Sequence, residues 1–158
     1  MSELLQQLSK DIFPPTLIQQ FVDWCIWEQA RPALLLVLHK VQLNELAQVL
    51  EAAQDIGQLL TATEQVAQRI HEARKSTGPL GLSAAEAAAY EMQNILKSAL
   101  DEGDDPESVA FFAARVCGWA AWAETNFTNP AQKPIAEAAA RDAQIHKLEN
   151  LIEQFRTD

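Results

Sequence analysis

Residues 105–127 read DPESVAFFAARVCGWAAWAETNF, and this stretch decides the fold. Asp105 is suited to cap the N-terminus of a helix, and Pro106 and Glu107 are typical of a first helical turn. Apolar side chains then occur on most faces of the expected helix, whereas the polar ones fall largely within one narrow arc. A helix that is apolar on most sides is buried on most sides. The stretch therefore predicts the central helix of an all-α domain.

The rest of the chain also favours helix. Its 158 residues are 48% hydrophobic and 22% charged, with five glycines and recurrent Ala, Leu, Gln and Glu. These are strong helix formers, and a chain of this length can bury one core. We therefore predict a single all-α domain over residues 1–158, a compact bundle of six or seven helices around the central helix at about 105–127.

Turn and cap signals divide the remaining chain. Arg31-Pro32 predicts a boundary or kink, because the residue before a proline avoids the α region. Thr61–Glu64 and Ser83–Glu86 each match a capping box that opens a helix, and residues 76–82 are expected to form a loop. The other helices are then expected at about 2–10, 15–30, 33–57, 61–75, 83–102 and 129–156.

The chain is acidic, with 22 acids against 12 bases and a formal net charge of −10. Such a surface repels nucleic acid and anionic membranes, and it steers a basic protein toward itself. The simpler interpretation is that the charge serves solubility alone. The sequence therefore predicts no nucleic-acid partner and no membrane partner, and it is compatible with a basic protein partner.

The cysteines and the first residues bear on the compartment. Cys25 and Cys117 lie in apolar helical stretches without CxxC spacing, so two buried free thiols are expected, as in a reducing cytoplasm. The first residues lack the basic and apolar regions of a secretory signal. The apolar run Pro32–Leu38 is far shorter than the ~20 residues of a membrane span. We therefore expect a cytoplasmic protein.

Residues 81–110 contain seven acids and one base, which is more than half of the excess negative charge. One interpretation is helix capping and a solvated hairpin tip. The functional interpretation is a docking surface for a basic partner, because complementary charge raises the rate of association. The predicted partner-binding residues are Glu86, Glu91, Asp101, Glu102, Asp104, Asp105 and Glu107.

Four tryptophans occur as two i, i+3 pairs on two aromatic helices. If these helices pack together, they can form an aromatic pocket with charged residues at its rim. The residues of this pocket would be Trp24, Trp27, Glu28, Arg31, Arg115, Trp119 and Trp122. The structural interpretation, which we favour, is plain core in which Arg115 pairs with Glu28 or Glu124.

The sequence contains no motif for catalysis, metal binding or nucleotide binding. His39, His71 and His146 stand alone, without a second ligand at i+3 or i+4 that completes a known metal motif. A nucleophile elbow, a glycine-rich phosphate loop and the Ca²⁺-ligand pattern of an EF-hand are also absent from the sequence. We therefore predict no metal, no cofactor and no enzymatic activity.

Two segments carry a family resemblance. Trp24-Cys-Ile-Trp-Glu28 with Arg31-Pro32, and Ala113-Ala-Arg-Val-Cys-Gly-Trp119, resemble an all-helical, Ala-rich family of immunity proteins from bacterial polymorphic toxin systems. The similarity covers about residues 17–152. Family members have histidines where this chain has Trp119 and Trp122, so no site residues are transferred. The resemblance implies a stoichiometric inhibitor that binds a toxin domain, and an acidic surface would suit a basic nuclease toxin.

Three hypotheses follow. The first is a non-enzymatic binding protein that occludes a basic toxin domain through the 86–107 hairpin. The second is a small-molecule-binding or enzymatic helical domain that uses the tryptophan pocket. The third is a homo-oligomer that associates through Leu148, Leu151 and Phe155 of the last helix.

Overall fold

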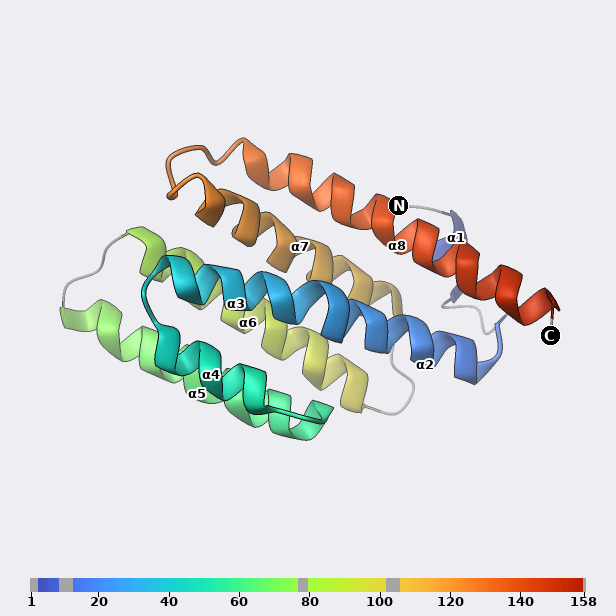
Figure 1. Ribbon diagram of the computed structural model, residues 1–158, viewed down its shortest axis with the longest axis horizontal. Coiled ribbons are helices and arrows are strands. Elements are labelled where there is room, and N and C mark those ends of the chain that lie inside the picture. The colour runs from blue at the N-terminus through green and yellow to red at the C-terminus, as the bar shows by residue number, and fades with distance from the viewer. Residues whose placement is uncertain (1–2, 9–12, 77–79, 102–105, 158) are drawn as a thin grey trace.

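The computed structural model describes residues 3–8, 13–76, 80–101 and 106–157. The described residues form seven helices when α2, η1 and α3, which follow one another without a break, are counted as one. This confirms the prediction of an all-α bundle. The elements are α1 (Glu3–Leu8), α2 (Pro15–Trp24), the π-helical η1 (Cys25–Ala30), α3 (Arg31–Lys40), α4 (Asn44–Ala52), α5 (Ile56–Ser76), α6 (Leu80–Leu100), α7 (Pro106–Glu124) and α8 (Gln132–Thr157). In Figure 1, α7 and α8 lie along one edge of the bundle and α4 and α5 along the other, with α3 and α6 between them.

The predicted central helix is α7, which packs against α1, α2, η1, α3, α6 and α8. Most of its buried residues are small: Val109, Ala110, Ala113, Ala114, Val116, Gly118, Ala120 and Ala123. The large aromatic side chains Phe111, Phe112, Trp119 and Trp122 are only half-buried. Phe112 and Trp119 pack against the core without being fully buried, so the prediction that these rings are core residues holds only in part. Small side chains allow neighbouring helices to approach closely, and the rings lie at the seams between helices.

Gly118 marks the closest approach of α8 to α7. A Cβ atom at this position would lie 2.9 Å from Glu137 Cγ and 3.2 Å from the backbone oxygen of Lys133. The helix backbone does not require glycine here, because α7 is regular through this residue. The glycine is therefore needed for helix packing.

The two predicted capping boxes are not helix starts. The helix expected to begin at Thr61 begins at Ile56, and Asp55 caps it by accepting a hydrogen bond from the Gln58 backbone N–H at 2.8 Å. Thr61 Oγ1 donates back to the Gly57 oxygen at 3.2 Å, as threonines do inside helices. Ser83 likewise lies inside α6.

The expected loop at 76–82 is shorter than predicted. Residues 80–82 belong to α6, and residues 77–79 lie outside the described residues. Gly81 is buried, and a Cβ atom there would lie 2.8 Å from Val41 and from the Phe127 ring.

Phe127 itself has a positive φ of 61°, an uncommon backbone conformation for an aromatic residue. Its ring packs edge-on against Trp122, with the centroids 5.8 Å apart. Tertiary packing therefore holds Phe127 in this conformation.

The predicted boundary or kink at Arg31-Pro32 is a change of helix type, because η1 ends at Ala30 and α3 begins at Arg31. The chain is continuous from α2 to α3 because η1 precedes the proline as a π-helical segment, closed by a hydrogen bond from the Arg31 N–H to the Ile26 oxygen. A proline lacks an N–H, and its ring crowds the carbonyl four residues earlier, here Glu28. A wider turn separates these groups, so the π-helical segment accommodates the proline.

A buried amide pair joins η1 to α7 and α8. Gln144 is fully buried, and its Nε2 donates to the Ala110 oxygen at 2.8 Å and to Gln29 Oε1 at 2.9 Å. Gln29 Nε2 in turn donates to the Ala140 oxygen at 2.9 Å. These bonds fix how three helices align along their axes, which apolar contact alone does not specify.

The last helix contributes to the core more than to a free surface. Leu148, Leu151 and Ile152 are buried within the bundle, whereas Phe155 is 56% exposed. Of the three residues predicted for an oligomer interface, Leu148 and Leu151 are therefore largely buried and Phe155 alone is well exposed, and the homo-oligomer stays a prediction.

We expect Gly118→Ala to lower the free energy of unfolding by about 1 kcal/mol, because the clash with α8 outweighs the usual gain of alanine in a helix. Gly57→Ala is the matched control, since its Cβ would meet only Asp55 Oδ1 at 3.4 Å. Urea denaturation of both variants checks this. A Gly118→Ala protein more stable than wild type would contradict the packing argument.

Gln144→Leu should lower the free energy of unfolding by about 2 kcal/mol, because it leaves Ala110 O and Gln29 Oε1 buried without this donor. Asn150→Leu places the same side chain on the exposed face of α8 and should change stability by less than about 0.5 kcal/mol. Equal effects of the two substitutions in urea denaturation would refute a structural role for the amide pair.

Candidate functional site

The structure separates the predicted acidic docking residues into two groups. Glu86 and Glu91 are 5% and 9% exposed, so neither lies on the surface where docking was expected. Asp101 is exposed just after α6, and Glu107 is half-buried in the first turn of α7. Glu102, Asp104 and Asp105 lie outside the described residues. The prediction that the hairpin acids form one continuous surface is therefore wrong for its two inner members.

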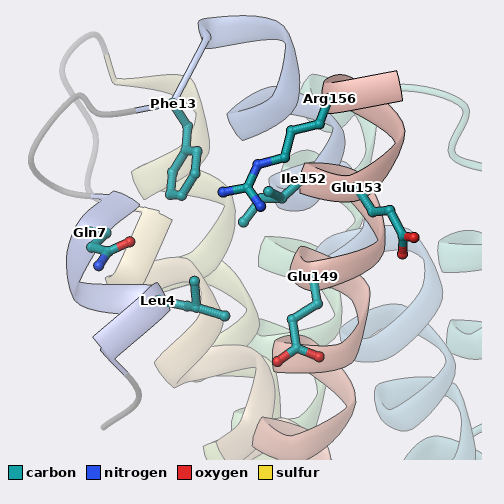
Figure 2. Close-up of a pocket in the computed structure, with 7 residues that line it drawn as sticks. All are labelled: Leu4, Gln7, Phe13, Glu149, Ile152, Glu153 and Arg156. Atoms are coloured by element: carbon teal, nitrogen blue, oxygen red, sulfur yellow. The ribbon is translucent and has the colours of Figure 1, made fainter. Parts of the chain in front are cut away.

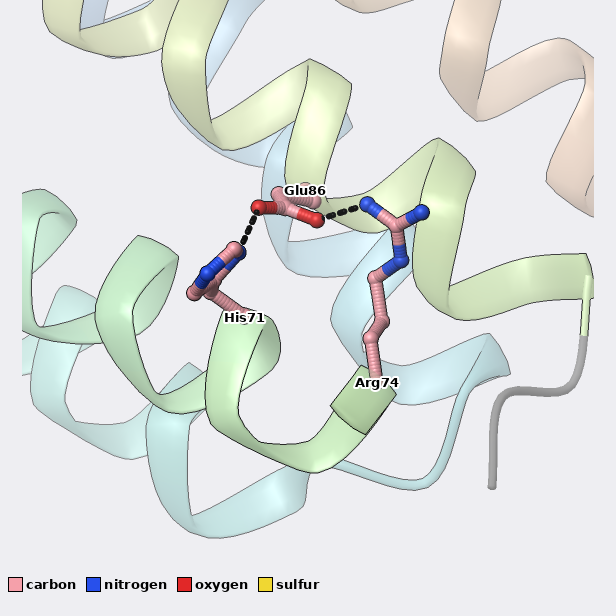
Figure 3. Close-up of polar contacts among 3 residues, drawn as sticks. All are labelled: His71, Arg74 and Glu86. Atoms are coloured by element: carbon pink, nitrogen blue, oxygen red, sulfur yellow. Dashed lines mark hydrogen bonds and ion pairs between the residues drawn. The ribbon is translucent and has the colours of Figure 1, made fainter. Parts of the chain in front are cut away.

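Glu86 connects α6 to α5 (Figure 3). Its Oε1 lies 2.9 Å from His71 Nδ1, and its Oε2 accepts a hydrogen bond from Arg74 Nη1. Burial by itself raises the pKa of this carboxyl, but the hydrogen bonds and charges of Arg74 and His71 outweigh it. The pKa of Glu86 therefore lies below its usual value of 4.5, and the group is ionised at neutral pH.

Glu91 connects α6 to α7. Its Oε1 accepts a hydrogen bond from Arg115 Nε, and its Oε2 accepts one from Trp119 Nε1 at 2.8 Å. The hydrogen bond to Glu91 also raises the pKa of Arg115. Arg115 was expected to pair with Glu28 or Glu124, and it pairs with neither. Glu124 instead lies 3.7 Å from Lys40 Nζ.

The second tryptophan pair lies between α7 and the start of α8. Lys133 Nζ is 3.3 Å from the centroid of the Trp119 ring, and the Trp119 and Trp122 centroids are 5.7 Å apart. Burial lowers the pKa of Lys133, although nearby Glu137 and Glu91 favour its charged form. A cation on an indole face is a stable arrangement, and this one joins the start of α8 to α7.

The first tryptophan pair lies elsewhere, in an open groove. Trp24 and Trp27 line a groove of about 410 Å³ between the α2–η1 helix and α8, together with Gln20, Asp23, Glu28, Lys147, Leu151 and Gln154. The Arg31 guanidinium lies 4.8 Å from the centroid of the Trp27 ring. The four tryptophans therefore do not form one pocket. The structure brings together Trp24, Trp27 and Glu28 with Arg31 close by, and it places Arg115, Trp119 and Trp122 in the α6–α7–α8 cluster.

Sequence reasoning missed acids beyond the hairpin. The His71–Glu86 contact sets an antiparallel register in which the start of α5 lies beside the end of α6. Asp55 and Asp101 are therefore at the same end of the bundle, and both are exposed. Figure 1 shows the α4–α5 connection and the end of α6 at this end. We call Asp55, Asp101 and Glu107 the acidic end.

A second cavity, of about 510 Å³, lies between α1 and the last turns of α8 (Figure 2). Leu4, Phe13 and Ile152 form its apolar part, and Gln7, Glu149, Glu153 and Arg156 its polar part. No sequence pattern indicates this cavity, because its two walls come from opposite ends of the chain.

Burial also explains the two thiols. Cys25 is buried and Cys117 half-buried, and both are free, as predicted. Burial raises the pKa of Cys117 to about 11 and raises that of Cys25 further. Both are therefore protonated at neutral pH and poor nucleophiles.

No protein-family model matches the chain, and no curated protein or solved structure is significantly similar to it. Among the described residues, no three His, Cys, Asp or Glu side chains are grouped as a metal site would require. Within those same residues, no helix has the combined length and apolar character of a membrane span.

Glu86→Gln should lower the free energy of unfolding at neutral pH by about 2 kcal/mol, because it removes a charged acceptor from Arg74. The folded-state pKa of Glu86 is depressed, so its ionised form stabilises the fold above the unfolded-state pKa, and this stability is lost as the pH falls. Urea denaturation at about pH 7 and about pH 3 should therefore show a smaller pH dependence in the variant than in wild type. Glu64→Gln, at an exposed position on α5, should retain the wild-type dependence.

Proposed function

We propose that the protein is a non-enzymatic, cytoplasmic binding protein that docks a basic protein partner over the groove of Trp24 and Trp27. The observation that supports this is the chemistry of the groove. Two half-buried indoles lie beside the carboxylates of Asp23 and Glu28. Indole faces attract guanidinium and ammonium groups, and carboxylates bind them through charge-assisted hydrogen bonds. Tryptophan and arginine are also the residues that most often dominate the energy of protein interfaces.

The acidic end supports the same kind of partner. Asp55 and Asp101 are exposed, and neither belongs to an ion pair among the described residues. The sequence has three more acids between Asp101 and Pro106. Together with the net charge of −10, these groups attract a basic protein from a distance and raise its rate of association. We therefore propose that the hairpin acids attract the partner from a distance and do not form a continuous contact surface with it.

The resemblance to immunity proteins suggests the class of partner. A toxin domain that acts on nucleic acid needs a basic surface, because it must neutralise phosphates. An acidic, rigid helical bundle can cover such a surface without chemistry of its own. We therefore propose a basic toxin domain as the partner and occlusion as the mechanism of inhibition.

A small cationic molecule is the second candidate for the groove. Its volume of about 410 Å³ falls in the range of small-ligand sites, and its indoles and carboxylates would suit an organic cation. The two candidates predict different sizes of partner, so direct binding measurements can separate them.

Where a basic toxin domain is encoded beside this chain, we expect it to bind, with an affinity that falls at least about tenfold in Trp27→Ala because an aromatic anchor is lost. Tyr90→Ala removes a ring that is 48% exposed on α6, outside the groove, and should leave the affinity unchanged. Calorimetric titration at low and high salt measures both, and the affinity should fall as salt rises.

An arginine-rich peptide and a quaternary ammonium compound serve as chemical probes in the same titration. Binding of the small cation without binding of the basic domain would favour the second candidate. If Trp27→Ala and Tyr90→Ala bind the toxin domain equally well, the groove is not the docking site.

A further inference from the structure

The three histidines of the chain differ in the side-chain oxygen that lies nearest to ring nitrogen Nδ1. His39 Nδ1 lies 2.8 Å from the amide oxygen of Asn44, and His146 Nδ1 lies 3.7 Å from a carboxylate oxygen of Glu149. His71 Nδ1 lies 2.9 Å from Glu86. The Glu86 side chain is 6% exposed, whereas that of Glu149 is 54% exposed. Of the three, His71 alone therefore has a buried carboxylate behind its ring.

This contact determines which nitrogen of His71 can react. When Nδ1–H donates to a carboxylate, the neutral ring carries its lone pair on Nε2. In Figure 3 the second ring nitrogen lies on the side of the imidazole away from Glu86. The His71 side chain is 52% exposed, so the ring is accessible from solvent. An oriented, accessible imidazole backed by a carboxylate is the arrangement of an activated nucleophile.

The cluster also stabilises the charge that a reaction at Nε2 would create. Bond formation at Nε2 makes the ring cationic while Nδ1 keeps its proton, and the Glu86 carboxylate stabilises that cation. Arg74 holds Glu86 in its ionised form and in position through its hydrogen bond to Oε2. Arg74 and Lys75 also lie three and four residues after His71, on the same face of α5, where they can attract an anionic donor.

We propose that His71 is a phosphoryl-acceptor site that takes a phosphoryl group at Nε2 from a phosphoramidate-class donor. The Nε2 lone pair forms a bond to phosphorus, and the phosphorus–nitrogen bond of the donor breaks. The leaving amine departs with the electron pair of that bond and with the proton that the zwitterionic donor already carries. The product is a phosphohistidine in which Nδ1 keeps its proton and still donates its hydrogen bond to Glu86. This role is independent of the Trp24–Trp27 groove, whose lining residues come from α2, η1 and α8 and not from α5.

The wild-type protein tests the proposal without any variant. The folded chain is incubated with phosphoramidate, and the rate of phosphorylation at each histidine is followed by ³¹P NMR and by peptide mapping under alkaline conditions. We expect His71 to react at least about tenfold faster than His146, although the His146 side chain is 80% exposed. Equal labelling of the three histidines, or faster labelling of His146, would overturn the proposal.

Glu86→Gln tests the role of the carboxylate in the same assay. The amide keeps the shape of the side chain but cannot stabilise a cationic ring, so the rate at His71 should fall at least about tenfold while the rates at His39 and His146 stay the same. Circular dichroism shows whether the variant is folded. If it is not, Arg74→Gln replaces it, with a smaller loss of rate expected at His71. A folded Glu86→Gln protein that reacts at the wild-type rate would show that His71 is merely exposed.

Discussion

Close packing of helices on the small side chains of α7 is the constraint on which the rest of the bundle depends. At Gly118 a Cβ atom would lie 2.9 Å from the Glu137 side chain and 3.2 Å from the Lys133 backbone oxygen, closer than ordinary van der Waals contact. The buried positions of α7 carry mostly small side chains, and Trp119 and Trp122 lie half-buried at the seams between α7 and its neighbours. There their edges and faces meet Glu91 and Lys133. The positions of the aromatic and polar clusters thus follow from how closely the helices pack.

Buried polar groups then fix how the helices align. Glu86 joins α5 to α6, Glu91 joins α6 to α7, and Gln144 joins α7 and α8 to Gln29 of η1. Apolar contact is non-directional and tolerates sliding, whereas a buried carboxylate or amide is costly unless it meets its partners. These residues therefore select one alignment of the helices. The same selection removes two carboxylates from the surface, where a smaller acidic end and the groove of Trp24 and Trp27 remain.

Part of the candidate site could have been found from the sequence. His71 lies five residues before the end of α5 at Ser76 and pairs with Glu86, six residues after the start of α6 at Leu80. Glu91 and Arg115 each lie nine residues from the facing ends of α6 at Leu100 and α7 at Pro106, and they pair as well. Counting outward from each turn identifies both pairs. The groove of Trp24 and Trp27 could not be found in this way, because α8 comes from the other end of the chain. The capping-box prediction failed at Thr61 for a local reason, since the motif also fits inside a helix once an earlier cap at Asp55 is available.

By itself, the amino-acid sequence determined that the chain is helical and that residues 106–124 are central. These properties depend on local propensity and on the periodicity of apolar residues, which are visible along one segment. Tertiary structure alone decided that Glu86 and Glu91 are buried and that the two tryptophan pairs lie apart. The physical reason is that a polar side chain can be buried only where it meets a hydrogen-bonding partner. Which partner it meets depends on which helices pack together and on how they align.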